Sequence, residues 1–520
     1  MATVARRTER EYDPEAGGMA ALDALKAMAG TAGVAAVSEQ DEQFFDAVYY
    51  DTADLRLIGG GITLRRRAGG EDAGWHLTLP AGADTGDVTR LLLTASGGAI
   101  PEDLTALIRA CTRGEPLAPV MCIRTSRRVL RLLDGANQIL AEIAADRVPA
   151  EPADGSAATS WDEIEAGLVA GAPVLLTAID TRLRHAGARP AATATKLRRP
   201  LTGRLPAARA APERPPLTRH SPAGEVVLAY LRDQVAAIIR YDPLVRLDEP
   251  DAVHRMRVAT RRARSALQAF GGILEREATR PLCAELRWLA AALGQARDTE
   301  VLRDRLTADL AAIPVALVVG PVQASITAHF AAELTQARQT ALGALDGQRY
   351  LRLLNDLIAL PADPPLTPSA KRQAGKVLAK PVRRAARRLQ RALDAVPGAD
   401  DRDTAIHEAR KATKRARYAA EAAVPALGGT ASRHVAQAKE LQQLLGDHHD
   451  SVVARTVLLN LAGKARAAGE DTFTYGLMYQ RQACLATTIE QTLPRFTAAL
   501  SGTTTLSSAA ASSGSDRGLA

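Results

Sequence analysis

Apolar and polar residues follow two different periods along the 520-residue chain. Up to about residue 203, short apolar segments with alternating polar positions are separated by Gly, Asp and Pro clusters, as in antiparallel strands joined by hairpins. Beyond residue 222, apolar residues recur every three or four positions, which predicts helices. The pattern therefore predicts an α+β chain of several domains, with an N-terminal antiparallel β sheet that forms a barrel or a sandwich and a C-terminal all-α domain.

Local signals divide these two parts further. A helix is expected over Met19–Met28, and strands are expected over Phe44–Tyr50, Ile62–Arg67, Trp75–Leu79, Val88–Thr94, Met121–Leu133, Gln138–Ile143 and Trp161–Ala166. The Pro-rich residues 204–222 predict a linker between a first domain, residues 1–203, and a helical domain, residues 223–500. Helices are expected over 223–241, 283–293, 301–313 and 323–345, with Gly294 near the end of one of them. The Ser- and Ala-rich residues 501–520 predict a disordered tail.

One helical segment is present twice. His254, Arg257, Arg261 and Arg264 stand at spacings that place them on one helix face, and we call them the first rail. The second rail has the same spacings and consists of His407, Arg410, Lys414 and Arg417. Each rail is followed by a Leu-Gly pair and then an Asp, at Asp298 and Asp450. The order indicates an internal duplication, with repeats at 223–360 and 369–500.

The duplicated rails favour a ligand over the usual explanation, a solvated helix face. Stacked like charges repel by a few tenths of a kcal/mol per pair, and an anion would relieve that repulsion. The formal net charge is +8, and between Lys371 and Arg417 there are fifteen Lys and Arg against five Asp and Glu. Folding about a pseudo-two-fold axis would bring both rails onto one basic cleft that holds a linear polyanion.

The remaining composition limits the location of the chain. The four Cys have no paired spacing, which indicates a reducing compartment and no zinc site. The longest apolar stretch, around Leu310–Val319, is interrupted by Pro314 and is too short to cross a membrane. We therefore expect a cytoplasmic protein without a membrane partner.

Five segments of the first domain resemble, in order, the CYTH family of triphosphate tunnel proteins. They are residues 9–11, 49–52, 61–67, 141–146 and 163–165. The resemblance implies an eight-stranded antiparallel tunnel and possible use of Mg²⁺ or Mn²⁺ as cofactor. It implies metal coordination by Glu9, Glu11, Glu142, Glu163 and Glu165, and triphosphate binding by Arg65, Arg67, Arg124 and Lys196.

Two positions depart from the CYTH pattern. Asp13 stands where the opening signature has a Lys, and Gly167 stands where a third late carboxylate is common. Because catalysis depends on positions held to within about an ångström, these departures favour a tunnel that binds triphosphate-like groups with weak or absent hydrolysis.

Both repeats of the helical domain resemble the CHAD family, which binds inorganic polyphosphate. The resemblance rests on residues 254–270, 286–301, 407–421 and 439–453. It implies two antiparallel four-helix bundles and orienting roles for Asp298 and Asp450. The implied phosphate contacts are His254, Arg257, Arg261, Arg262, Arg264, Arg383, Arg384, Arg387, Arg388, His407, Arg410, Lys411, Lys414, Arg415 and Arg417.

The combined interpretation is a polyphosphate-binding protein that needs no cofactor for that binding and can associate with polyphosphate granules. One alternative is a metal-dependent inorganic triphosphatase. A second is a nucleic-acid-binding protein, which is less favoured because few aromatic residues accompany the rails. The adjacent His448 and His449 lack the partner spacing of a metal site, so no metal is expected there. The sequence does not determine the oligomeric state.

Overall fold

The structure is a computed structural model that describes residues 3–7, 9–14, 18–69, 73–80, 88–93, 98–191 and 215–509. The chain divides into two compact units, Met1–Arg214 and Pro215–Ala520. Lys196, residues 204–214 of the expected linker and residues 510–520 lie outside the described residues.

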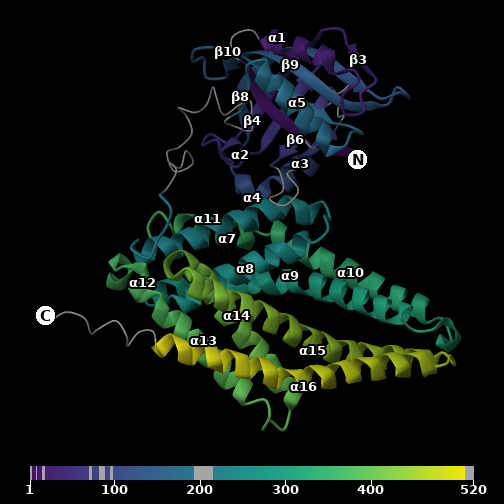
Figure 1. The fold of residues 1–520 in the computed structure, drawn as a ribbon, viewed down its shortest axis with the longest axis vertical. Coiled ribbons are helices and arrows are strands. Elements are labelled where there is room, and N and C mark those ends of the chain that lie inside the picture. Colours follow the sequence, from purple (N-terminus) through teal and green to yellow (C-terminus); the bar gives the residue numbers. More distant parts are fainter. Residues whose placement is uncertain are drawn as a thin grey trace. The chain divides into compact units, whose positions relative to one another are not determined.

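The first unit is built on one antiparallel sheet, as the alternating pattern predicted (Figure 1). Its neighbouring strands are β1 (Thr3–Arg7), β7 (Val88–Leu93), β6 (Gly74–Leu79), β5 (Thr63–Ala68), β4 (Gln43–Asp51), β8 (Ala118–Leu133), β9 (Ile139–Pro152), β10 (Thr159–Leu168), β2 (Glu9–Pro14) and β11 (Ala188–Pro190), with β3 (Ala36–Glu39) paired to β8. All seven expected strands are present. The edge strands β1, β3 and β11 carry too few alternating residues to be recognised from the sequence.

The hydrogen-bonded ladder of this sheet is not closed, but its two sides follow one another in the chain. Strand β1 ends at Arg7 beside β7, and β2 begins at Glu9 beside β10. Two trans peptide bonds separate these residues, so their Cα atoms lie within about 7.6 Å. The sheet must therefore curl until its two sides are adjacent.

Helices cover one face of the curled sheet. Tyr12, Ile143 and Ile164 from the sheet pack in one core with Leu22 and Ile179. The helices that contribute are α1 (Gly18–Asp23), the 3₁₀ segment η1 (Ala24–Met28) and α5 (Pro173–His185). The inside of a small barrel holds only side chains, so this helix-covered face is the outer one. The opposite face, which carries the charged residues discussed below, points inward.

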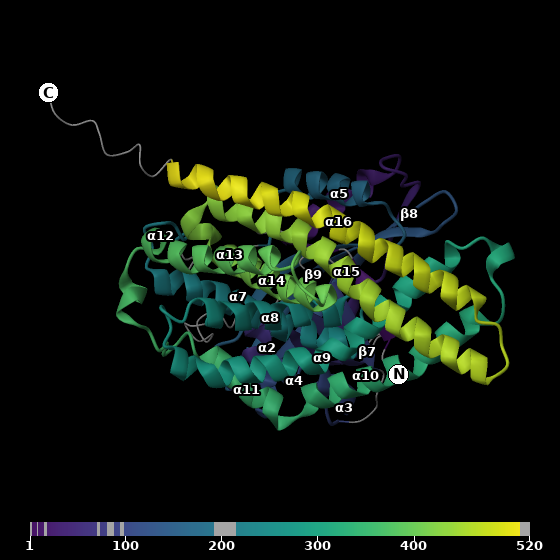
Figure 2. The ribbon, with the colours of Figure 1, turned by 90° about the horizontal axis from the view of Figure 1, so that it is seen from below.

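The second unit is entirely helical apart from short connections (Figures 1 and 2). Its elements are α7 (Ala223–Arg246), α8 (Ala252–Ala269), α9 (Arg276–Ala311), η2 (Val315–Leu317), α10 (Val322–Asp346), α11 (Gln348–Ala359), η3 (Pro368–Lys371), α12 (Ala374–Val377), α13 (Ala379–Asp394), α14 (Arg402–Leu427), α15 (Gly429–Ala467) and α16 (Phe473–Ala509). None of the helices in the described ranges is long and apolar enough to cross a membrane.

The two helical repeats share part of their interior. Leu306 of α9 and Phe330 of α10 belong to the same apolar cluster as Leu458 of α15 and Met478 of α16. In both views the pair α15 and α16 lies side by side as a long hairpin (Figures 1 and 2). A common core indicates that the repeats fold against each other rather than as separate bundles.

Several expected boundaries of the helical unit are wrong. Residues 283–293 and 301–313 are not two helices, because α9 runs unbroken past Gly294 to Ala311. Helix α7 likewise continues through Pro243 to Arg246. Helix α16 extends to Ala509, beyond the expected start of a tail at residue 501. In α9, burial of Leu286, Leu289 and Leu293 along one face outweighs the low helix propensity of Gly294.

Candidate functional site

The inward face of the sheet gathers charged side chains from adjacent strands. In the strand register, Glu11 on β2 lies opposite Glu165 on β10, and Glu9 lies opposite Gly167. On the other side of β10, Gly167 faces Glu142 of β9 and Glu163 faces Asp146. Directly paired residues share a sheet face. All five glutamates expected as metal ligands therefore occupy one face.

Gly167 lies against the side chain of Glu9. A Cβ atom at position 167 would lie 3.4 Å from the Cγ of Glu9 and 3.8 Å from its Oε1, which is van der Waals distance. The residue that interrupts the expected run of carboxylates is therefore in close proximity to one of them.

Arg127 of β8 connects the acidic and basic halves of this face. Its guanidinium donates two hydrogen bonds of 2.7 Å to Asp146 and lies 3.5 Å from Glu165. Burial alone would lower the pKa of Arg127, but the carboxylates of Asp146 and Glu165 raise it overall. The aromatic ring of Phe45 lies 3.6 Å from the guanidinium carbon of Arg67 and 5.8 Å from that of Arg127.

The strand register corrects one expected residue and adds others. Arg65 and Arg67 lie opposite Tyr49 and Ala47, on the inward face, and Arg65 donates to the Tyr49 hydroxyl at 3.0 Å. Arg124 lies opposite Asp46 on the outer face and is 72% exposed, so it does not join them. Arg127 and Arg131, which alternate with Arg124, take the inward positions. Alternation in the sequence separates Arg124 from Arg127 but does not indicate which one points inward.

The carboxylates suit Mg²⁺ or Mn²⁺ by donor type, because hard divalent cations prefer oxygen ligands. However, no three of them within the described residues offer ligand atoms within 4.8 Å of one another. Glu142 is held by Arg131 at 2.9 Å, and Glu165 is close to Arg127. A metal ion could bind only if these arginines moved away from the carboxylates. A phosphate chain that bound the guanidinium groups would leave the carboxylates available to the metal.

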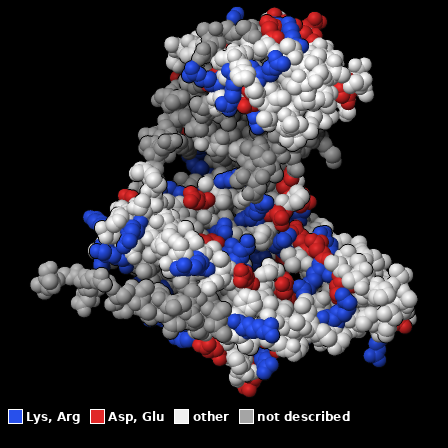
Figure 3. Space-filling view, in the orientation of Figure 1, with Lys and Arg blue, Asp and Glu red and all other residues white. Residues whose placement is uncertain are grey.

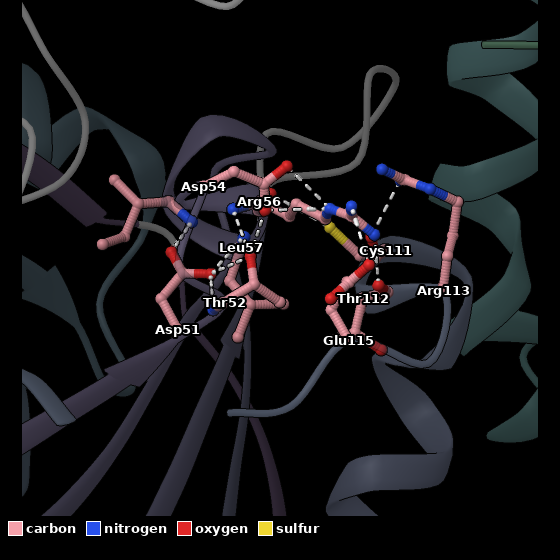
Figure 4. Close-up of polar contacts among 10 residues, drawn as sticks. Asp51, Thr52, Asp54, Arg56, Leu57, Cys111, Thr112, Arg113 and Glu115 are labelled. Atoms are coloured by element: carbon pink, nitrogen blue, oxygen red, sulfur yellow. Dashed lines mark hydrogen bonds and ion pairs between the residues drawn. The ribbon is translucent and has the colours of Figure 1, made fainter. Parts of the chain in front are cut away.

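The Tyr-Tyr-Asp-Thr segment of the CYTH resemblance has a structural role in this chain. Asp51 is fully buried, and its carboxylate accepts hydrogen bonds from the backbone N–H groups of Thr52, Leu57 and Ile58 at 2.7–3.0 Å (Figure 4). It satisfies the free N–H groups at the start of the short helix α2 (Arg56–Gly59). Arg56, one turn on, donates to the Thr112 carbonyl at 2.6 Å and joins α2 to α4 (Arg109–Thr112).

In the helical unit the two rails face each other. Helices α8 and α14 are joined by Glu421, whose carboxylate binds Arg262 of α8 at 3.0 Å and Arg417 of α14 at 3.0 Å. The hydroxyl of Tyr230 in α7 donates to the same carboxylate at 3.3 Å. The one acid therefore holds together three helices from both repeats.

In the first repeat, Arg257 contacts both the Gly and the Asp that follow the rail. A Cβ atom at Gly294 would lie 3.4–3.5 Å from the guanidinium of Arg257, which is van der Waals distance, so this group packs closely against α9. The same group donates to both oxygens of Asp298 at 2.8 and 3.1 Å, one turn further on. Gly294 lies inside α9 and is not the helix end expected from the sequence. Asp298 orients the cation, as predicted.

Lys414 lies at the centre of the converging cations. Its side chain is only 9% exposed. Burial, with the positive charges of Arg261, Arg410 and Arg257, lowers the pKa of Lys414 from its ordinary 10.5 to about 6. Burial and the neighbouring charges also lower the pKa values of Arg261 and Arg410. We call Arg257, Arg261, Arg410 and Lys414 the cation cluster.

The rail histidines differ in their surroundings. His407 stacks on His449 of α15 with ring centroids 4.8 Å apart. Burial and the charge of Arg410 lower the pKa of His449 to about 4, and burial also lowers the pKa of His407. The side chain of His254 reaches solvent, but partial desolvation of its ring and the charge of Arg297 lower its pKa. With a pKa of about 4, the His449 imidazole is neutral at neutral pH in the ligand-free protein.

The other expected phosphate contacts lie farther from the cluster. Lys411 is exposed and pairs with Glu408 at 2.7 Å, and Arg415 is exposed near Arg264. On α13, Val382, Leu389 and Leu393 are buried, while Arg383, Arg384, Arg387 and Arg388 are all exposed on the opposite side of the helix. Exposed Lys and Arg also occur among Asp and Glu over the side shown in Figure 3.

The fold and the doubled rails define a CHAD-type helical protein, and sequence comparison agrees. The CHAD domain family matches residues 229–459. An uncharacterized Mycobacterium tuberculosis protein, MT2285, is 39% identical over 465 residues, 85% of this chain and 87% of its own length. The chain belongs to the same family as this protein and carries a CHAD domain.

Solved structures are similar to each part of the chain. PptA from Streptomyces chartreusis matches 53% of this chain and 99% of its own, with 24% identity and a TM-score of 0.46. The CHAD domain from the plant Ricinus communis matches 55% of this chain and 93% of its own, with 25% identity and a TM-score of 0.44. HpAC1 from Hippeastrum, for which a dominant triphosphatase activity is described, matches 39% of this chain and 96% of its own, with 14% identity and a TM-score of 0.23.

Proposed function

We propose that the helical unit binds inorganic polyphosphate at the cation cluster. The observation that carries the proposal is the crowding of Arg257, Arg261 and Arg410 around the buried Lys414. Burial and, after it, these neighbouring positive charges lower the pKa of Lys414 to about 6. Crowding cations in a partly buried place is unfavourable unless an anion relieves it. In the described residues, the buried Nε of Arg410 has no hydrogen-bond partner, which leaves a donor for a phosphate oxygen.

A condensed phosphate chain fits this arrangement better than a compact anion. The cluster draws on α8 and α14, one helix from each repeat, and each helix supplies two of its four cations. Guanidinium groups bind phosphate oxygens through two parallel donors. The exposed arginines of α13 and the pair Arg264 and Arg415 offer further contacts for a longer chain. Affinity should rise with chain length and fall steeply with added salt.

Binding to polyphosphate of several lengths tests this proposal, with two Lys→Gln variants. Lys414→Gln removes from the cluster an amine that a bound phosphate chain would protonate. Lys464→Gln makes the same substitution at an exposed position roughly 20 Å farther along α15 than Asp450. We expect at least a ten-fold loss of affinity in Lys414→Gln and little change in Lys464→Gln. Equal affinity in both variants, or displacement of polyphosphate by RNA at equal phosphate concentration, would contradict the assignment.

We further propose that the inward face of the sheet binds a triphosphate-like group. Arg65, Arg67 and Arg127 supply guanidinium groups on the same face as the glutamates. This combination also supports a second candidate function, metal-dependent hydrolysis of tripolyphosphate, because the carboxylates released by the arginines could hold Mg²⁺ or Mn²⁺.

Phosphate release from tripolyphosphate distinguishes binding from hydrolysis. Release that requires Mg²⁺ or Mn²⁺ and is lost in Glu163→Gln would establish the triphosphatase. Tripolyphosphate binding without release under either metal would leave the first unit as a binding module. Arg127→Gln should weaken binding in both cases.

A further inference from the structure

A three-residue group lies beside the second rail and takes no part in the proposed phosphate contacts. Among the described residues, Asp403, His448 and Glu490 are the one set of three potential metal ligands whose donor atoms all lie within 4.8 Å of one another. They come from three helices, α14, α15 and α16. His448 is 1% exposed, and its Nε2 lies 3.3 Å from Glu490 Oε1 and 3.6 Å from Asp403 Oδ1.

Both carboxylates are oriented through their second oxygen. Arg455 contacts Oδ2 of Asp403 at 3.2 Å, and Arg402 contacts Oε2 of Glu490 at 3.4 Å. The remaining oxygens, Oδ1 and Oε1, are the ones directed at the imidazole. Metal-binding carboxylates commonly show this division, with one oxygen for the metal and the other for a hydrogen-bonding partner.

The internal duplication provides a comparison within the same chain. Aligned by their Leu-Gly pairs, His448 corresponds to Ala296 of the first repeat, which is also buried. Aligned by the rail histidines, Asp403 corresponds to Pro250. The fold of a repeat therefore requires neither the imidazole nor this carboxylate. Both appear together in one repeat only, as expected for residues that act jointly.

We propose that Asp403, His448 and Glu490 bind one divalent transition-metal cation of the Zn²⁺ type. One imidazole nitrogen and two carboxylate oxygens form a donor set that such cations accept, and three protein ligands leave a further coordination position open. The Asp403 and Glu490 side chains are 43% and 23% exposed, so the cation can enter from solvent. Arg402 and Arg455 offset part of the negative charge, which makes the site weaker than a structural zinc site.

The cation would join the start of the second rail to its neighbours. Asp403 stands one helical turn before His407, and His448 is adjacent to His449, which stacks on His407. Metal bound at Asp403 and His448 would therefore fix the relative positions of α14 and α15 at the head of the rail. The proposal does not depend on phosphate binding.

Titration of the full-length, chelator-treated protein with Zn²⁺ in the absence of phosphate tests the site. His448→Ala introduces the residue that the first repeat has at the corresponding position. Glu490→Gln keeps the side-chain volume and removes a charged ligand. We expect each variant to lose one bound Zn²⁺ equivalent or at least ten-fold in affinity for it, while Glu163→Gln in the first unit retains that equivalent.

Co²⁺ in place of Zn²⁺ adds a spectroscopic measurement, because an imidazole ligand changes its visible absorption. The wild-type spectrum should lose this contribution in His448→Ala. Equal Zn²⁺ stoichiometry and affinity in the wild type, His448→Ala and Glu490→Gln would overturn the proposal. If His448→Ala fails to fold by circular dichroism, Glu490→Gln alone decides the outcome.

Discussion

Replacing Lys414 by Met should stabilise the ligand-free protein while weakening polyphosphate binding. The folded pKa of about 6 lies below the ordinary 10.5, so folding requires Lys414 to release its proton at any pH between these values. This release costs at most about 4 kcal/mol at pH 7.5 and about 1.4 kcal/mol at pH 9.5. Met fills a similar volume without this cost.

The sign and the pH window of this effect distinguish it from a simple packing change. Below pH 6 the folded protein keeps the charge and the full cost. As pH rises from 6 to 10.5, the unfolded chain increasingly loses the same proton, so the stability advantage of Lys414→Met should shrink. Chemical denaturation of both proteins at several pH values measures it. A variant no more stable at pH 7.5, or a difference constant from pH 6 to 10, would refute the reasoning.

The same shift implies that polyphosphate binding takes up a proton. At pH 7.5 Lys414 is mostly neutral when free, and a bound phosphate chain would restore its charge, with an uptake of about one proton. Calorimetric titrations in buffers of different ionisation enthalpy report the number directly. Lys414→Met should remove about one proton from it, and an unchanged number would place the uptake elsewhere.

Three further changes follow from the contacts described. Glu421→Gln should lower the free energy of unfolding by about 2 kcal/mol, since Arg262 and Arg417 lose the carboxylate that they share. The same change should tighten polyphosphate binding. Thermal unfolding measures the first effect, and a binding titration measures the second. Asp51→Asn should destabilise the first unit by about 2 kcal/mol, because an amide cannot accept all three backbone N–H groups, and an unchanged unfolding midpoint would contradict this. Arg127→Gln should weaken tripolyphosphate binding by ten-fold or more while the outward Arg124→Gln leaves it unchanged; equal effects would place the ligand outside the curl.

The sequence predicted the element types well because they depend on periodicity, and the same periodicity places the cations of each rail on one helix face. A spacing of three and four residues places Arg257 with Arg261, and Arg410 with Lys414, on one side of their helices whatever the tertiary structure. The repeated motif then indicated that the two sides belong together. The expected strands lay in long runs of alternating apolar and polar residues, a pattern that is not easily assigned to a helix or a loop.

Other features depended on contacts between distant residues. Gly294 has the sequence signal of a helix end, but α9 continues through it because tertiary contacts bury Leu286, Leu289 and Leu293 along one face. Arg124 and Arg127 stand equally well on either face until the register with β4 and β9 is known. Asp403, His448 and Glu490 come from three helices with no regular spacing, so no local pattern could have brought them together.

Because β2 follows β1 directly in the chain, the circumference of the curled sheet in the first unit is limited. Because one continuous polypeptide belongs to both sides of the sheet, the interior widens only if strands separate elsewhere or the chain is severed. A single proteolytic cut between Arg7 and Glu9 would allow the curled sheet to open at this place, while the strand pairings elsewhere in the sheet stay intact.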